Sequence, residues 1–213
     1  MEIQDQINRT VEIPENPERI ISLVPSITEL LFDLGLERQM AGRTRFCIHP
    51  PDRVKNIPVV GGVIGLNAHE IDKIGPDLIL ASREENAKNE VLDLARNYSV
   101  WISDVHNLEQ ALEMIKTIGK ITSRSEQADQ MAGRITNAFQ QLDHIPAGIV
   151  RAVYLVWNDP LYTINQTTFI HDMLKRCGIE NVFADQQKAY PIIREKDMRA
   201  RKPDYIFLPD EPY

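Results

Sequence analysis

Two kinds of hydrophobic pattern alternate along the chain, and together they predict an α/β fold. Short runs of apolar, often β-branched residues stand at 19–24 (RIISLV), 77–81 (DLILA) and 151–156 (RAVYLV), which is typical of strands buried on both faces of a parallel sheet. After the first run, Ser26 opens a segment with helical spacing that stops at Gly35. The alternation of such strands with helices indicates mainly parallel sheets covered by helices.

The longest helical pattern runs from Ser123 to Leu142. Its apolar residues recur at steps of three and four, so one side of the helix is expected to be buried and the other faces solvated. Ser123 and Glu126 have the spacing of a capping box, and Pro146 and Gly148 predict where the helix ends. The buried stripe is expected to consist of Ala128, Met131, Ile135, Ala138, Phe139 and Leu142.

The order of elements before this helix is repeated after it. Gly75 to Leu80 (GPDLIL) is echoed by Lys202 to Phe207 (KPDYIF), each preceded by a short helical pattern. We therefore expect two α/β lobes with mainly parallel sheets, joined by one long backbone helix. A single larger α/β domain, with the helix as one more crossover, is the alternative.

The repeat also predicts that the second lobe is truncated at the C-terminus. About 46 residues follow Pro76 before the long helix begins, whereas ten follow Pro203. A lobe shortened in this way would leave one sheet edge unpaired. The expected divisions are an N-terminal hairpin or edge segment at 1–18, an N-terminal α/β lobe at 19–122, the connecting helix at 123–145, and an incomplete C-terminal α/β lobe at 146–213.

Composition narrows the class of function. The chain is 43% hydrophobic and 26% charged, as is ordinary for a globular protein, and its net charge is −7. Without a basic cluster, binding to nucleic acid or to an anionic membrane surface is not expected. The polar start MEIQDQINRT lacks the features of a secretory signal, so we expect a cytoplasmic chain if Met1 is the native start and a trimmed one otherwise.

The candidate site lies on the loops that follow the predicted strands, because ligands bind at the carboxyl ends of parallel sheets. Arg45 could bind anionic groups, and Tyr162 and Tyr190 could stack on flat ones. Cys47 and His49 could ligate a soft metal, although two donors make a weak pattern and no metal site is expected. The candidate ligand-binding residues are Arg45, Cys47, His49, Ser82, Glu84, Tyr162 and Tyr190, and no motif for catalysis or for a resident cofactor is present.

Several segments, taken in order, resemble the class III periplasmic binding proteins, the helical-backbone receptors for cobalamin, haem and ferric siderophores. They are 19–35 (RIISLVPSITELLFDLG), the Gly61–Gly62 loop, 75–80, the long helix and 177–183 (CGIENVF). The resemblance implies two lobes joined by a rigid helix and a metal chelate held between them, with no chemistry on the ligand. It also implies a periplasmic location if a signal was removed.

The resemblance further implies a partner and places it on the surface. Relatives that engage an ABC permease present one glutamate on each lobe, and Glu70 and Glu195 lie next to the matching positions here. We therefore expect a non-enzymatic monomer that delivers a metal chelate to an ABC importer. A cytoplasmic sensor or enzyme that uses the same cleft without a transporter is the alternative.

Overall fold

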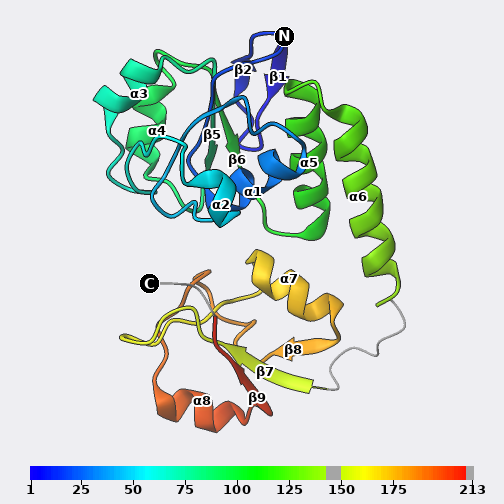
Figure 1. Cartoon of the computed structure of the whole chain (residues 1–213). Coiled ribbons are helices and arrows are strands. Elements are labelled where there is room, and N and C mark those ends of the chain that lie inside the picture. Colours follow the sequence, from blue (N-terminus) through cyan, green and yellow to red (C-terminus); the bar gives the residue numbers. More distant parts are fainter. Residues whose placement is uncertain (143–149, 210–213) are drawn as a thin grey trace. The chain divides into compact units, whose positions relative to one another are not determined.

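The computed structural model in Figure 1 describes residues 1–142 and 150–209, which form two compact units. Unit 1 comprises Met1–Asp104 with Leu112–Ala132, and unit 2 comprises Val105–Ala111 with Gly133–Tyr213. Helix α6 (Ser125–Gln140) crosses the division, so its first half belongs to unit 1 and its second half to unit 2. The chain therefore has two α/β lobes and one long helix that connects them.

Unit 1 is built on a four-stranded, wholly parallel sheet with the order β4-β3-β5-β6. The strands are β3 (Ile20–Ser22), β4 (Met40–Arg43), β5 (Leu78–Ser82) and β6 (Val100–Ser103). The central strands are buried on both faces, as their continuous apolar runs predict. The helices of this unit are α1 (Pro25–Asp33), α2 (Pro51–Val54), α3 (Ala68–Ile74), α4 (Lys88–Leu94) and most of α5 (Leu108–Ile121).

An antiparallel hairpin of β1 (Glu2–Gln4) and β2 (Thr10–Glu12) covers the outer edge of β6. The Gln6 amide donates to the Ile102 carbonyl at 3.1 Å, and the indole N–H of Trp101 donates to the Gln4 carbonyl at 3.3 Å. Covering an edge strand satisfies backbone groups that would otherwise pair with another chain. The hairpin lies within the N-terminal segment 1–18, and its structural role is to close this edge.

Unit 2 holds a smaller parallel sheet with the order β8-β7-β9. Its strands are β7 (Val150–Tyr154), β8 (Ile179–Asn181) and β9 (Tyr205–Phe207), and its helices are α7 (Phe169–Arg176), α8 (Glu195–Arg201) and the second half of α6. In both units the first strand is central, the second lies on one side of it and the third on the other. The predicted repetition is thus visible in the strand order, but among the described residues of unit 2 no strand corresponds to β6.

The start of α6 differs from the prediction. Ser123 adopts a left-handed conformation with φ of 57°, and its hydroxyl bonds to the Asn16 side chain, so it cannot cap the helix. The Arg124 carbonyl accepts the first helical hydrogen bond, from the Ala128 amide at 3.0 Å. The predicted stop at Pro146 and Gly148 lies outside the described residues.

The buried stripe of α6 is narrower than its apolar pattern suggests. Ala128 and Ala132 are buried, Ala138 is exposed, and the larger side chains of the expected stripe are half-buried. The tight contact is with Gly119 of α5, where an added Cβ would lie 2.3 Å from the Ala128 Cβ. Small residues on both helices therefore let α5 and α6 approach closely.

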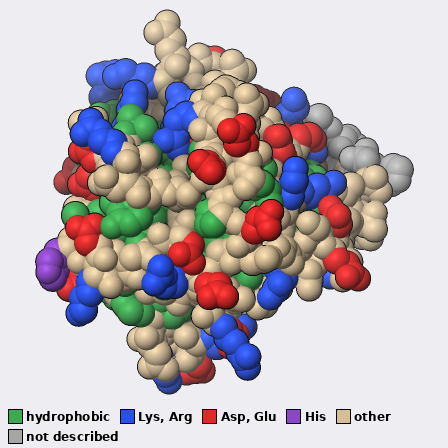
Figure 2. Space-filling view, turned by 90° about the horizontal axis from the view of Figure 1, so that it is seen from above, with side chains coloured by type: hydrophobic (Ala, Val, Ile, Leu, Met, Phe, Trp, Pro, Cys, Tyr) green, Lys and Arg blue, Asp and Glu red, His purple; other side chains and the backbone are tan. Residues whose placement is uncertain are grey.

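Charges of both signs are interspersed on the surface. On the face shown in Figure 2, Lys and Arg side chains lie among Asp and Glu side chains, with hydrophobic side chains visible between them. Across residues 1–142 and 150–209, no helix has the length and apolar character that crossing a membrane requires.

Candidate functional site

Asn86 joins the loops at the carboxyl end of the unit 1 sheet. Its amide nitrogen donates to the Leu23 carbonyl at 3.2 Å and to the Val63 carbonyl at 3.1 Å, and its side-chain oxygen accepts from the Ser82 amide at 2.9 Å. Only 7% of Asn86 is exposed. A single buried side chain thus connects the turn after β3, the glycine-rich loop and the loop after β5.

The glycine-rich loop from Gly61 to Leu66 is held against α4. The Glu90 carboxylate accepts hydrogen bonds from the Gly65 and Leu66 amides, each at 3.1 Å. A Cβ on Gly61, whose φ is 122°, would lie 2.6 Å from the Gly65 carbonyl oxygen. Glycine is therefore required at position 61 because the backbone of the same loop leaves no room for a Cβ.

Arg45 lies on the loop after β4, and its backbone joins this loop to the glycine-rich one. Its amide donates to the Gly61 carbonyl at 2.8 Å, and its guanidinium carbon lies 5.9 Å from the centre of the Phe46 ring. Arg45 is exposed, and within the described part of the chain it has no carboxylate partner. We call residues 44–50 and 59–66 the Arg45 loop pair.

The Arg45 loop pair carries an unusual share of the exposed large hydrophobic side chains. The exposed fractions range from 39% for Ile48 to 66% for Ile64, and Phe46 and Val59 lie between them. Exposed apolar groups on the same two loops as an unpaired cation suit a ligand with a large apolar body and an anionic edge. This combination is the strongest indication of a binding surface in unit 1.

Two neighbours of Arg45 do not share this exposure. Cys47 is fully buried, and its sulfur lies 3.2 Å from the Thr44 hydroxyl, so its thiol has no surface to offer a ligand. Arg43 turns inward and donates to the Val54 and Thr44 carbonyls at 3.0 and 3.1 Å. His49 is exposed, which separates it from Cys47, and the described residues contain no group of three or more side chains suited to holding a metal ion.

Ser82 and Glu84 lie on the loop after β5, but in different settings. The Ser82 hydroxyl accepts from the Glu84 amide at 3.2 Å, and the Glu84 side chain is exposed. Ser82 also lines a cavity of about 500 Å³ on the side of the sheet near the β1–β2 turn, together with Asn8 and Lys88. The structure therefore places Ser82 and Glu84 at the expected end of the sheet.

Tyr162 and Tyr190, predicted from distant parts of the sequence, line one cavity of about 630 Å³ in unit 2. Tyr162 pairs with Trp157 and with Ile192, and the Thr163 amide donates to the Pro191 carbonyl at 3.0 Å. Trp157 and Ile192 are 50% and 59% exposed. The loops at this end of unit 2 thus offer aromatic and apolar surface.

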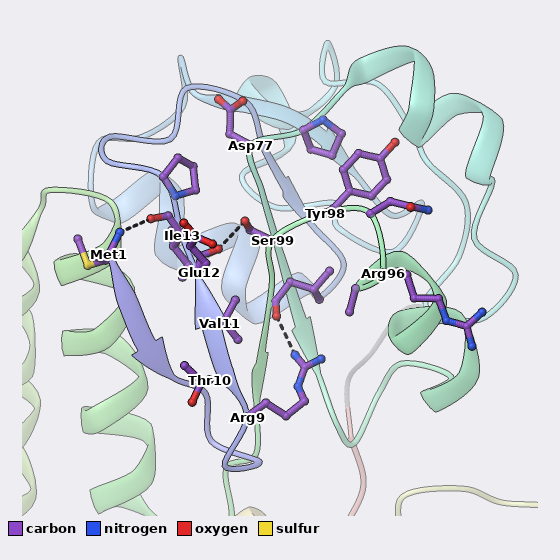
Figure 3. A pocket seen from close by; sticks show the side chains of 15 residues that line it. Met1, Arg9, Thr10, Val11, Glu12, Ile13, Asp77, Arg96, Tyr98 and Ser99 are labelled. Atoms are coloured by element: carbon purple, nitrogen blue, oxygen red, sulfur yellow. Dashed lines mark hydrogen bonds between the residues drawn. The ribbon is translucent and has the colours of Figure 1, made fainter.

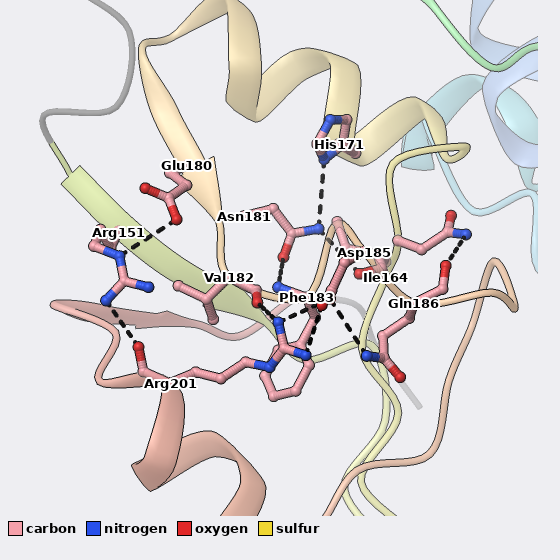
Figure 4. Close-up of polar contacts among 11 residues, drawn as sticks. Arg151, Ile164, His171, Glu180, Asn181, Val182, Phe183, Asp185, Gln186 and Arg201 are labelled. Atoms are coloured by element: carbon pink, nitrogen blue, oxygen red, sulfur yellow. Dashed lines mark hydrogen bonds and ion pairs between the residues drawn. The ribbon is translucent and has the colours of Figure 1, made fainter.

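Arg201 of α8 positions the loop that forms the other wall of this cavity (Figure 4). Its guanidinium makes two bonds of 2.8 and 2.9 Å to the Asp185 carboxylate, donates to the Val182 carbonyl and lies 4.7 Å from the centre of the Phe183 ring. Hydrogen bonding by Arg201 holds the pKa of Asp185 below its ordinary value. The same figure shows Asn181, whose amide donates to the Ile164 carbonyl at 3.0 Å.

A further cavity of about 660 Å³ lies elsewhere in unit 1, beside β2 and the turn before β6 (Figure 3). Several of its polar groups already have partners in the protein. Arg9 donates to the Val100 carbonyl at 2.7 Å, the Ser99 hydroxyl donates to the Glu12 carbonyl at 2.6 Å, and the Tyr98 hydroxyl bonds to Asp72. Because these groups are satisfied and lie away from the carboxyl ends of the strands, we do not place the ligand there.

Glu70 and Glu195 occupy the first turns of α3 and α8, the helices that precede β5 and β9 in the two units. Glu70 lies 3.9 Å from the Lys73 ammonium, and Glu195 bonds to Arg199 at 3.0 Å. Both carboxylates are at least 37% exposed, and surface ion pairs of this kind contribute little. They therefore remain available to a partner.

Sequence reasoning missed several residues that shape the two surfaces. Phe46, Ile48 and Ile64 could have been noticed as apolar side chains in glycine- and proline-flanked loops. Asn86, Glu90 and Arg201 gave no such signal, because their role depends on partners distant along the chain.

Known proteins resemble this chain over most of its length. The family model for periplasmic binding proteins matches residues 20–211. A vitamin B12-binding protein of Salmonella typhimurium strain LT2 is 31% identical over 193 residues, which cover 89% of this chain and 71% of that protein.

Solved structures share the fold. The periplasmic vitamin B12-binding protein of Vibrio cholerae superposes with a TM-score of 0.83 at 24% identity, covering 92% of this chain and 78% of that one. A protein of Staphylococcus epidermidis, described as a possible iron-binding, periplasmic solute-binding protein, superposes with a TM-score of 0.76 at 27% identity. The match covers 91% of this chain and 78% of that protein's chain. From the match across residues 20–211, this chain belongs to the periplasmic binding protein family.

Proposed function

We propose that this chain is the non-enzymatic, monomeric substrate-binding component of an ABC importer, and that it binds a metal chelate such as a corrinoid, haem or ferric siderophore. The observation that carries the proposal is the Arg45 loop pair, where an exposed, unpaired arginine lies among exposed apolar side chains. Metal chelates of this class combine a broad apolar body with anionic groups. The relatives that bind vitamin B12 support the same ligand class.

The candidate residues have separate roles in this proposal. Arg45 binds an anionic group, and Phe46 and Ile64 cover apolar surface. In unit 2, Tyr162 and Tyr190 contact a flat part of the ligand, because tyrosine rings offer large apolar faces at little cost in conformational entropy. Ser82, Glu84 and His49 supply polar contacts at the rim, and Cys47 is left out because it is buried.

Ligand binding is tested by thermal-shift and absorbance titrations of the purified chain with haem, cobalamin and ferric siderophores. A chelate present at a hundred times its dissociation constant stabilises the protein by about 2.7 kcal/mol. Replacing Arg45 by glutamine should weaken binding of that chelate about tenfold, because one charge-assisted hydrogen bond is lost.

Arg38→Gln is the matched control. Arg38 is exposed near the opposite end of β4, and its replacement by glutamine removes the same charge as Arg45→Gln. Its affinity for the chelate should equal that of the native chain. The proposal is wrong if no chelate stabilises the chain, or if the two arginine variants weaken binding equally.

We further propose that Glu70 and Glu195 dock the chain on a permease with basic sockets. Changing both to glutamine should lower ligand uptake roughly tenfold in cells that carry the importer, because charge complementarity governs the association rate. Ligand affinity of the purified variant should stay unchanged. Glu29→Gln, an exposed change on α1, is the control, and equal uptake by the double variant and this control would refute the docking role.

A further inference from the structure

A cavity of about 500 Å³ in unit 1 lies outside the Arg45 loop pair, and we call it the α4 cavity. One wall is α4, with Lys88, Val91 and Leu92, and the other walls are the ends of β5 and β6 and the turn between β1 and β2. Small-molecule sites occupy volumes of about 300 to 1,000 Å³, so this cavity is large enough for a ligand. None of the described residues 44–50 and 59–66 lines it, which separates it from the surface proposed for the chelate.

The wall provided by the β1–β2 turn is held in place by the protein itself. The buried Asp5 carboxylate accepts hydrogen bonds from the Ile7 amide at 3.2 Å and from the Arg9 amide at 2.8 Å. The Gln6 side chain, which lines the cavity, accepts from the Asp104 amide at 3.0 Å. The cavity is therefore formed before any ligand enters, which lowers the entropic cost of binding.

Part of the lining is apolar. Val91 and Ile102 are almost fully buried, whereas Ile7 and Leu92 are half-buried and retain surface in contact with solvent. Removing such surface from water favours a ligand that has an apolar body.

The charged residues that line the α4 cavity are Arg83, Lys88 and Asp104, so their net charge is positive. The Asp104 carboxylate is already paired with one guanidinium nitrogen of Arg83, at 2.6 Å. Among the described residues, the other guanidinium nitrogens of Arg83 have no acceptor, and the exposed Lys88 has no partner. Lysine and arginine side chains can only donate hydrogen bonds, and these unused donors favour an anionic ligand.

We propose that the α4 cavity binds a small carboxylate that has an apolar body. Lys88 and the unused N–H groups of Arg83 bind the carboxylate, and Ile7 and Leu92 contact the apolar body. Phosphate or sulfate would leave the apolar part of the lining in water. A wholly apolar ligand would cover the lysine without supplying a counter-charge.

This proposal does not rest on chelate binding. Of the residues proposed to contact the chelate, Ser82 lines the α4 cavity, and its hydroxyl has no role in binding the carboxylate.

The test uses the full chain with phenylpropionate as the probe, followed by the amide signals in NMR spectra. Phenylpropionate should shift the signals of Ile7, Asn8 and Leu92 saturably, because these residues line the cavity. Acetate has the same charge without the apolar body, and phenylpropionamide has the same body without the charge. Each should bind about tenfold more weakly or worse, because it keeps one of the two kinds of contact.

Two lysine substitutions test the role of the cation. Lys88→Gln should weaken phenylpropionate binding about fivefold, because it removes one exposed charge that faces the carboxylate. Lys120→Gln is the matched control, since Lys120 is exposed on α5 and does not line the cavity. Spectra recorded without the probe show that both variants are folded.

The proposal fails if phenylpropionate shifts none of the cavity residues, or if its shifts map to the Arg45 loop pair. It also fails if acetate or the amide binds as tightly as phenylpropionate, or if the two lysine variants bind the probe equally well. Because none of these measurements uses a chelate, their outcome is distinct from that of the chelate titrations.

Discussion

Replacing Asn86 by leucine should lower the free energy of unfolding of unit 1 by about 3 kcal/mol, because it leaves buried backbone groups without partners. Leucine has nearly the shape of asparagine, so the change removes hydrogen bonds and creates little cavity. The Leu23 and Val63 carbonyls lose their donor, and the Ser82 amide loses its acceptor. Each unsatisfied buried group costs about 1 to 3 kcal/mol, and partial hydration near the exposed end of the glycine-rich loop reduces the sum.

Urea unfolding followed by the fluorescence of Trp101 measures this effect. Trp101 is fully buried in unit 1, and a Trp157→Phe background removes the only other tryptophan in the chain. Asn89→Ala in α4, the helix that follows Asn86, is the matched control, because Asn89 is exposed, and the stability of this variant should change by less than about 0.5 kcal/mol. If Asn86→Leu unfolds at the same urea concentration as this control, the amide does not hold the three loops together.

The same substitution should also weaken ligand binding. Because Asn86 fixes the glycine-rich loop, and that loop fixes Arg45 through the Gly61 carbonyl, Asn86→Leu should weaken chelate binding under conditions in which the variant is still folded. Isothermal titration at a temperature well below the unfolding transition separates this effect from loss of folded protein.

Replacing Gly119 by alanine should also cost about 3 kcal/mol, because the added methyl group has no space between α5 and α6. The new Cβ would lie 2.3 Å from the Ala128 Cβ and 3.0 Å from the Arg124 carbonyl oxygen. One of these neighbours is backbone, so relief requires the two helices to separate. Thermal unfolding followed by circular dichroism measures the change.

Gly133→Ala is the matched control within α6. Nothing lies within 4 Å of a Cβ built on Gly133, and alanine is favoured over glycine in a helix by about 1 kcal/mol. The same substitution should therefore stabilise the protein at one position and destabilise it at the other. A loss of stability at both positions would show that backbone freedom, and not the close approach of α5 and α6, sets the requirement for glycine.

Local patterns predicted much of the fold. The apolar runs at 19–24, 77–81 and 151–156 were predicted as strands and contain β3 and most of β5 and β7, since strands buried on both faces form continuous apolar runs. Helix α2, a single turn that begins at Pro51, was missed because four residues are too few to show a helical period. Strand β8 was missed because three residues carry too little pattern, and pairing with β7 defines it.

The candidate site was predicted in outline and not in its contacts. Tyr162 and Tyr190 share a cavity, as strands that end at one edge of a sheet suggest they should. Cys47 was placed on the ligand surface and is instead buried, because the turn closed by its amide on the Thr44 carbonyl, at 3.2 Å, brings its side chain against Thr44. Periodicity cannot reveal such a detail in a segment without regular structure.

The amino-acid pattern alone therefore predicts the α/β class, the long helix and the repeated order of strands and helices in two lobes. Strands and helices bury residues at periods of 2 and 3.6, and these periods are visible in a short stretch of sequence. Only the folded chain shows that Asn86 joins three loops and that the hairpin covers β6. These features depend on strand order and on hydrogen bonds between groups up to 97 residues apart, such as the one from Trp101 to Gln4. Local periodicity does not encode which distant group becomes a neighbour.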